Sequence, residues 1–170
     1  KGTNRAQFFR GEVNKYGWVD IGSSFLPSEV TAAFLYAQLI NLQQIQQKRI
    51  SIWNRYYQCL KPLEEKGFIE LPKLPVYATN NAHMFYIICK DNKTQQDLLA
   101  FLKEKGILAT FHYLSLHKSP FYTDKHDGRE LPMSDYYTEH LIRLPLFYSL
   151  TDEQQSEVIK CIFKFYKINF

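Results

Sequence analysis

The chain has 170 residues, of which 45% are hydrophobic and 22% are charged, the balance of an ordinary globular protein with room for one sizeable domain. Its net charge of +4 comes from scattered residues, which argues against nucleic-acid binding and suits small anionic ligands such as sugar nucleotides. No apolar run has the ~18 residues that a membrane span needs. The polar opening KGTNRAQFFRG lacks both a signal peptide's apolar core and an initiator methionine, so we expect a cut edge there.

The three cysteines, Cys59, Cys89 and Cys161, are widely spaced and form no CxxC pair. This pattern favours reduced, mostly buried thiols of a cytoplasmic protein over a redox or metal site. The aromatic content of 16% predicts large contact areas, either in a core or at a subunit interface.

Residues 1–27 are rich in glycine, asparagine, serine and aromatic residues, the composition of a loop that lies against another surface. Ser28 is a good helix N-cap, and no glycine or proline occurs from Glu29 to Lys61. Apolar residues recur there at near-helical spacing, which predicts one helix, straight or bent, of about 32 residues and roughly 48 Å. Such a helix exceeds the ~26 Å diameter of a 100-residue domain, so we expect it to link two bodies.

The remainder, residues 62–170, predicts a small α+β domain with a three-stranded sheet flanked by helices. Its first part, LPKLPVYATNN, is an extended connection because it holds two prolines. Pro145 places the third strand at an edge of the sheet or ends it. The expected strands are HMFYIICK, ILATFHYL and IRLPLF.

Three helices alternate with these strands. The first, in KTQQDLLAFLKEKG, should end at Gly106. The second, in MSDYYTEHL, should begin at Ser134 as N-cap. The third begins at Thr151, with Glu153 and Gln154 near the position of a capping box.

The candidate functional residues lie in TFHYLSLHKSPFY, residues 110–122. His112 and His117 are five residues apart, which does not place them on one helical face, so a shared metal is not expected. His112 ends a strand, where a partly buried structural histidine and a pocket residue are both open. His117 begins a loop, where sites are often built, and a site and a structural role are equally open.

The other histidines are expected to be structural or solvated, and the acidic residues to belong to a solvated loop. The sequence has no GxGxxG, Walker A, GxSxG or HExxH motif, so spacing alone indicates no reaction. The residues judged structural or solvated are His83, His126, His140, Asp124, Asp127, Glu130 and Asp135.

Several stretches, in chain order, resemble the C-terminal part of the DegT/DnrJ/EryC1/StrS family of sugar-nucleotide aminotransferases. They are KGTNRAQFFRGEVNKYGWVDIGSSFLPSEVTAAFLYAQL, NAHMFYI, FHYLSLHKSPFY and RLPLFYSLT. The resemblance implies a fold-type I enzyme, in which a large α/β domain holds pyridoxal 5′-phosphate as a Schiff base to a lysine. A small C-terminal α+β domain closes over it, and two subunits share each active site.

The resemblance also implies a division of this chain into three parts. Residues 1–27 would be an arm on the large-domain side, residues 28–61 the linking helix, and residues 62–170 the small domain. The cofactor lysine of the family lies upstream of the GTNR block, so this chain would carry no catalytic residue and would be inactive by itself.

The family places the segment before the long helix in the partner subunit's cofactor pocket. Leu26 stands where many relatives have an asparagine, so the resemblance leaves Ser23 or Ser24 to contact the cofactor phosphate through a hydroxyl.

The HYLSLH strip matches a family segment beside the sugar. It implies that His117 meets the substrate, with His112 and Tyr113 behind it. Arg5 and Arg10 would bind a carboxylate or diphosphate, which a guanidinium can hold by two hydrogen bonds.

The implied reaction moves an amino group from glutamate to the keto carbon, C4 or alternatively C3, of a dTDP-4-keto-6-deoxyhexose. Pyridoxal phosphate supplies the electron sink. The implied setting is lipopolysaccharide or surface-polysaccharide biosynthesis by a cytoplasmic homodimer, with no nucleic-acid partner, no membrane span and no metal. The alternative is a stand-alone, non-catalytic binding or interaction domain.

Overall fold

A computed structural model describes residues 2–22 and 26–169 and divides the chain into two compact units, 1–42 and 43–170. Within the first unit, helix α1 spans Arg5–Phe9 and helix α2 spans Glu29–Ile40. The segment around α1 folds back on itself, because Thr3 and Trp18 form an antiparallel bridge. A Cβ at Gly2 would lie 1.9 Å from the Asp20 carbonyl oxygen, so this close approach requires glycine.

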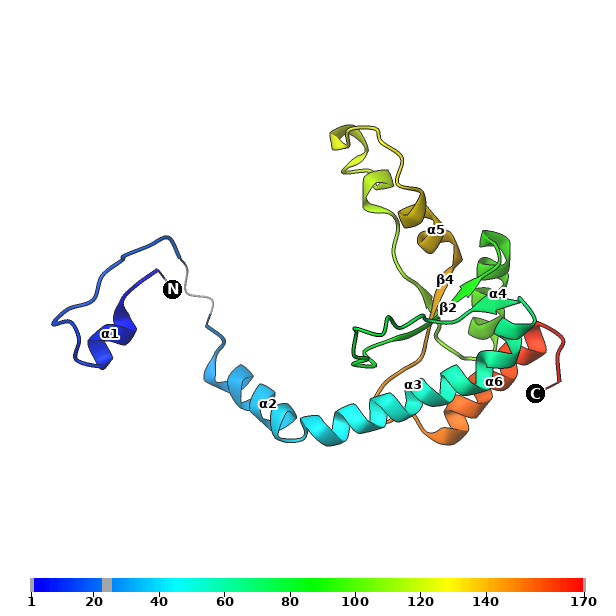
Figure 1. The fold of residues 1–170 in the computed structure, drawn as a ribbon, viewed down its shortest axis with the longest axis horizontal. Helices are drawn as coiled ribbons and strands as arrows, with labels where there is room; N and C mark the ends of the chain where they lie inside the picture. The colour runs from blue at the N-terminus through cyan, green and yellow to red at the C-terminus, as the bar shows by residue number, and fades with distance from the viewer. Residues whose placement is uncertain (1, 23–25, 170) are drawn as a thin grey trace. The chain divides into compact units, whose positions relative to one another are not determined.

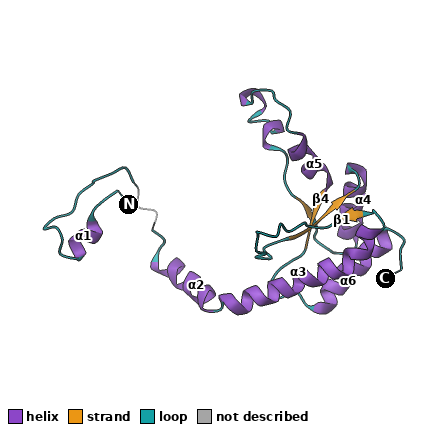
Figure 2. Cartoon of the chain, in the orientation of Figure 1, coloured by secondary structure: helices purple, strands orange, loops and turns teal. Residues whose placement is uncertain are grey.

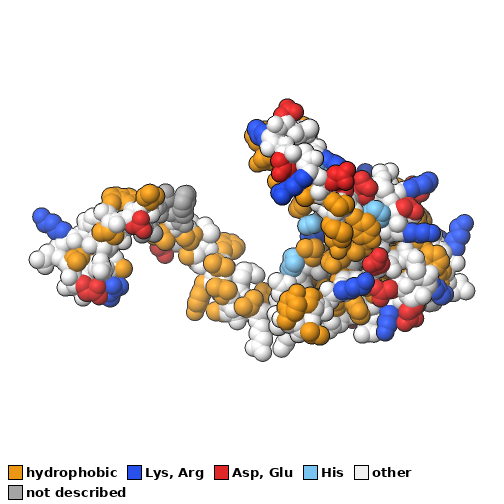
Figure 3. Space-filling model, turned by 45° about the horizontal axis from the view of Figure 1, so that its top comes forward, with side chains coloured by type: hydrophobic (Ala, Val, Ile, Leu, Met, Phe, Trp, Pro, Cys, Tyr) orange, Lys and Arg blue, Asp and Glu red, His pale blue; other side chains and the backbone are white. Residues whose placement is uncertain are grey.

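Helix α2 begins as expected, since the Ser28 hydroxyl accepts a hydrogen bond from the Thr31 N–H at 3.2 Å. Most of its side chains are apolar, and none of its residues is buried within the chain; Figure 3 shows exposed apolar side chains on the face that it draws. A helix of this kind normally lies inside a larger assembly. The exposed apolar side chains include Val30, Phe34, Leu35, Tyr36, Leu39 and Ile40.

The expected single helix over 28–61 is corrected to two helices, α2 and α3 (Leu42–Glu65). The division falls at Asn41, whose side-chain amide donates to the Ala37 carbonyl at 2.9 Å and so competes with the backbone of a continuing helix. Helix α3 also runs past Lys61 and includes Pro62. A proline there loses one backbone hydrogen bond, but its neighbours in α3, Leu60 and Leu63, are fully buried and hold the turn in place.

The second unit is built on a four-stranded antiparallel sheet in the order β1-β2-β4-β3 (Figure 2). Strand β1 was not expected, because it has only two residues and lies beside the proline-rich connection. Strand β4 lies inside the sheet instead of at its edge, and it ends just before Pro145. The strands are β1 Ile69–Glu70, β2 Phe85–Cys89, β3 Thr110–Phe111 and β4 Leu141–Leu144.

Three helices and two short 3₁₀ turns complete this unit. Helix α4 ends with Gly106 at φ 73°, and α6 begins with the capping box of Thr151 and Gln154, both as predicted. Helix α5 begins at Pro132, so Ser134 is not its N-cap; proline suits the first helical position because its missing N–H is not needed there. The elements are α4 Asn92–Glu104, η1 Leu116–Lys118, η2 Thr123–Lys125, α5 Pro132–His140 and α6 Asp152–Phe165.

The core of the second unit lies between one face of the sheet and helices α3, α4 and α6 (Figure 1). Helices α3 and α6 are joined by Gln155, which is buried and whose amide donates to the Ile52 carbonyl at 2.7 Å. All three cysteines are free thiols, with Cys89 and Cys161 buried. Burial raises the pKa of the Cys89 thiol to about 12, so this thiol is unreactive at neutral pH. In the part of the chain that the structure describes, no helix is both long and apolar enough to cross a bilayer.

Candidate functional site

The segment predicted to carry the site, residues 110–122, begins in β3 and leaves the sheet where that strand ends. His112 follows the strand directly, and Tyr113 has φ 63°, a left-handed conformation that is unusual for a bulky residue. The chain then turns through η1, which contains His117 and Lys118. Strained backbone conformations of this kind cluster at functional sites, so the left-handed conformation of Tyr113 makes this segment a candidate for such a site.

His117 is held by an acidic residue on α5. Its Nε2 atom lies 3.4 Å from Oδ1 of Asp135, and only 10% of its side chain is exposed. Its ring centroid lies 5.3 Å from that of His126. The imidazole is therefore oriented by its neighbours and is not a freely moving surface group.

Lys118 binds the other oxygen of the same carboxylate, with Nζ 2.7 Å from Oδ2 of Asp135. The hydrogen bond from Lys118 lowers the pKa of the Asp135 carboxyl, with smaller contributions from Ser115 and the charge of His117. The same bond raises the pKa of Lys118. Asp135 thus stays ionised at neutral pH and holds two consecutive residues of η1.

A chain of hydroxyl groups reinforces this junction between η1 and α5. Ser115 is buried, and its Oγ lies 3.1 Å from the Ser134 hydroxyl and 3.0 Å from the Thr138 hydroxyl. The buried amide of Gln95 donates to the carbonyl oxygens of Thr138 and Leu141, at 3.0 and 2.9 Å. Helix α4 therefore fixes α5, and α5 fixes the turn that carries His117.

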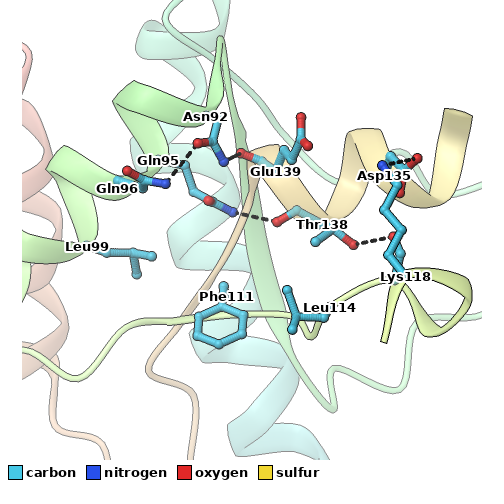
Figure 4. A pocket seen from close by; sticks show the side chains of 11 residues that line it. Asn92, Gln95, Gln96, Leu99, Phe111, Leu114, Lys118, Asp135, Thr138 and Glu139 are labelled. Atoms are coloured by element: carbon cyan, nitrogen blue, oxygen red, sulfur yellow. Dashed lines mark hydrogen bonds and ion pairs between the residues drawn. The ribbon is translucent and has the colours of Figure 1, made fainter. Parts of the chain in front are cut away.

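A cavity of about 340 Å³ opens beside this junction (Figure 4). Leu99, Phe111 and Leu114 form its apolar wall. Asn92 and Gln95 of α4 also line it, and their amides donate to carbonyl oxygens of α5. Lys118 and Asp135 line this cavity and also a second one, of about 390 Å³, that His117 and His126 share. The ion pair therefore borders both hollows, and the second hollow also contains the two histidines.

His112 lies apart from the Asp135 junction and contacts other groups. Its ring centroid is 4.7 Å from that of Tyr113, and its Nδ1 atom is 3.5 Å from Nη1 of Arg143 on β4. The structure thus forms two clusters from the predicted strip, His112 with Tyr113 and His117 with Asp135.

The predicted arginines belong to the first unit. The guanidinium of Arg5 lies over the rings of Phe9 and Tyr16, at 5.2 and 5.7 Å from their centroids. Arg10 forms an exposed ion pair with Glu12, at 2.6 Å. Both arginines already have partners within α1 and the loop that follows it. The other predicted contacts, Ser23 and Ser24, lie outside the described residues.

One expectation about a polar residue is corrected, and two about histidines are confirmed. Asp135, predicted to belong to a solvated loop, lies on α5 and binds η1. A spacing of 18 residues from His117 gave no local signal for that contact. His126, expected to be structural or solvated, packs against His117 and is structural. His140 is structural as expected, because its Nδ1 lies 2.6 Å from the Tyr136 carbonyl oxygen.

Arg143 was not predicted, although a signal for it was present. It is the one basic residue within the apolar run LIRLP, and a charge inside such a run points to a specific role. Among the described residues, no cluster of three or more His, Cys, Asp or Glu side chains is arranged to hold a metal ion.

Comparison with known proteins relates this chain to aminotransferases. The model of the DegT/DnrJ/EryC1/StrS aminotransferase family matches residues 1–163. The aminotransferase TlmJ from Streptoalloteichus hindustanus is similar over 98% of this chain and 42% of its own, with 22% identity and a TM-score of 0.78. A DegT DnrJ EryC1 StrS aminotransferase from Brucella abortus is similar over 95% and 42%, with 26% identity and a TM-score of 0.74.

A third similar structure is NtdA from Bacillus subtilis with bound cofactor PMP. It is 30% identical over 71% of this chain and 28% of its own, with a TM-score of 0.62. The chain thus spans less than half the length of these three proteins. The fold likeness extends over nearly the whole chain in the two longer matches, and it agrees with the α+β architecture described above. The chain belongs to the DegT/DnrJ/EryC1/StrS aminotransferase family.

Proposed function

We propose that the chain is the C-terminal part of a longer, pyridoxal phosphate-dependent sugar aminotransferase. The enzyme would move an amino group from glutamate to C4 of a dTDP-4-keto-6-deoxyhexose, as a dTDP-4-amino-4,6-dideoxygalactose transaminase does. It would act as a cytoplasmic homodimer in lipopolysaccharide or surface-polysaccharide biosynthesis. The observation that carries this proposal is the family match over residues 1–163.

Lys118 does not suit the role of the lysine that binds pyridoxal phosphate. A lysine that bonds covalently to this cofactor must react as a free amine. Lys118, which lines a hollow together with His117 and His126, is instead paired with Asp135, which raises its pKa and keeps it an ammonium ion. We therefore assign no cofactor step to this chain and propose that the lysine comes from a preceding segment.

The role proposed for this chain is to orient the sugar. His117 is mostly buried and fixed by Asp135, and it borders the histidine-lined hollow beside Lys118. An imidazole held in this way can hydrogen-bond a sugar hydroxyl or keto oxygen in a defined direction. In the enzyme, pyridoxal phosphate would act as the electron sink for the transfer.

The first unit would contribute to cofactor and substrate binding in the assembled enzyme. We propose that Ser23 or Ser24 contacts the cofactor phosphate of the partner subunit and that Arg5 and Arg10 bind anionic groups of the substrate. On this account residues 1–27 are the arm, helices α2 and α3 together link the two parts of the enzyme, and the small domain follows α3. The uncovered apolar side chains of α2 support a location inside a larger protein.

Transamination by the longer protein tests this proposal. The protein is incubated with glutamate and dTDP-4-keto-6-deoxyglucose, and the product is identified by mass spectrometry and NMR. An amine at C4 is expected, and an amine at C3 would change the assigned position. No amino sugar from any nucleotide keto sugar would contradict the proposal.

A stand-alone binding or interaction domain is the second candidate. It is favoured by the second unit, residues 43–170, which forms a compact body with its own hydrophobic core. This candidate predicts that no longer protein with transaminase activity contains the chain.

A further inference from the structure

Arg143 lies in the middle of the sheet on the face opposite the core. Its neighbours in β4, Ile142 and Leu144, are buried, and alternate residues of a strand point to opposite faces. Arg143 is paired in register with Tyr86 on β2 and with Thr110 on β3. Side chains of directly paired residues share a face, so a guanidinium, a phenol and a hydroxyl form a row across three strands.

The charge of Arg143 has no counter-ion within the described residues. Among those residues, its side chain makes one polar contact: Nη1 lies 3.5 Å from Nδ1 of His112. Its Nε atom is buried and has no hydrogen-bond partner. A partly buried guanidinium without an acceptor is costly, because its lost hydration is not replaced. By contrast Arg55, on α3, is fully engaged by Asp152, Gln155 and Ser156.

The groups around Arg143 are donors. An arginine N–H only donates, so the contact with His112 makes Nδ1 the acceptor and leaves the Nε2–H of that ring free to donate. Burial and the nearby Tyr137 raise the pKa of Tyr86, which keeps its phenol protonated. Two residues after the end of β3, Tyr113 has a left-handed backbone, and its ring packs on that of His112. Strained backbone conformations cluster at functional sites, so this one supports a site beside Arg143.

We propose that Arg143, with His112 and Tyr86, binds an anionic group of a substrate through paired oxygen atoms. A guanidinium holds a carboxylate or a phosphate by two parallel hydrogen bonds, and the neighbouring donors match further oxygen atoms. The inference rests on the proposed function, which supplies two anions of this kind, the carboxylate of glutamate and the diphosphate of the sugar nucleotide. Arg143 would thus be a substrate-binding residue in the second unit, separate from the His117 and Asp135 cluster.

Calorimetric titration of the longer protein tests this inference. Glutamate and dTDP are titrated separately into the wild type, R143Q, R143K and K160Q. Loss of bidentate hydrogen bonding to an anion should weaken binding of one ligand by about 10-fold or more in R143Q. R143K keeps the positive charge but loses the planar guanidinium that forms two parallel hydrogen bonds. Its Kd should therefore lie between those of the wild type and R143Q. K160Q removes the same charge from an exposed position on α6 and should bind both ligands like the wild type.

The outcomes separate the two proposals. If the wild type binds the ligands and R143Q binds both with unchanged Kd, the inference fails while the proposed function stands. An equal loss in K160Q would also overturn it, because the effect would then be one of net charge. If the wild type binds neither ligand, the proposed function fails, and this inference fails with it. Should R143Q not fold, R143K decides: an unchanged Kd for both ligands overturns the inference, and a weaker one supports it.

Discussion

The Tyr56 hydroxyl donates a hydrogen bond to the Pro145 carbonyl at 3.0 Å, across 89 residues of sequence. The bond ties α3 to the end of β4, where the strand leaves the sheet. Tyr56 is fully buried, and burial raises the pKa of its phenol, so it stays protonated and donates this bond at neutral pH.

Substitution Y56F should destabilise the protein. It removes the phenol oxygen and leaves the Pro145 carbonyl without this donor, and we expect a loss of about 1–2 kcal/mol in the free energy of unfolding. Urea denaturation followed by circular dichroism measures the change. The matched control is Y57F, since the half-buried Tyr57 makes a ring contact with Trp53 that phenylalanine retains. Equal stability of Y56F and Y57F would show that the bond contributes nothing.

Substitution D135N should lower stability in a pH-dependent way. The pKa of Asp135 is below its ordinary value of 3.8 in the folded protein, chiefly because Lys118 donates to it. The contribution of the ionised carboxylate is therefore present above pH 3.8 and is lost as the pH falls through the lower, folded-state pKa. Urea midpoints of the wild type and D135N should differ at pH 7 and converge in acid.

The control for this experiment is D124N, which removes the same charge from an exposed residue of η2. It should change the midpoint little at either pH. A difference between wild type and D135N that stays constant from pH 7 into acid would contradict the role of the Asp135 carboxylate charge.

Substitution T151A should weaken the start of α6. The Thr151 hydroxyl accepts from the Gln154 N–H at 3.2 Å, and the Gln154 side chain accepts from the Thr151 N–H at 3.0 Å. Loss of such a cap costs about 1 kcal/mol. The same urea titration measures it, and T151S is the control, because serine keeps the hydroxyl and should retain most of the stability. Similar losses in both variants would rule out the cap as the cause.

Local signals predicted most of the secondary structure. Ser28, Gly106 and Thr151 mark helix ends through caps that depend on neighbouring residues, and all three predictions are confirmed. Errors arose where a longer-range contact decided the outcome. Burial of Leu60 and Leu63 carries α3 through a proline, and pairing with β2 creates the two-residue strand β1.

The sequence identified only part of the candidate site, because longer-range contacts complete it. Residues 110–122 were singled out by composition, but the partners of His117 and His112 come from α5 and β4. Asp135 and Arg143 are brought to these histidines by the folding of the chain, over separations of 18 and 31 residues. Sequence spacing holds no information on such contacts. The charges of Asp135 and Arg143 are visible in the sequence, but their histidine partners are not.

Substitution H117A in the longer protein should reduce turnover and leave the cofactor in place. If His117 orients the sugar, its loss should lower kcat/KM for the nucleotide sugar by about 100-fold. Steady-state kinetics and the visible spectrum measure the two effects. H83A is the control, because His83 is exposed and contacts Asn81 on the same loop. Unchanged turnover in H117A would remove His117 from the site.

The absorbance spectrum of the longer protein, recorded with pyridoxal phosphate before and after addition of glutamate, tests the central claim most directly. The account predicts a near-visible band of protein-bound pyridoxal that glutamate bleaches, and no such band from the 170-residue chain alone. A longer protein that shows no band, or a 170-residue chain that acquires the band by itself, would contradict the claim that this chain completes a sugar aminotransferase whose cofactor lysine lies elsewhere.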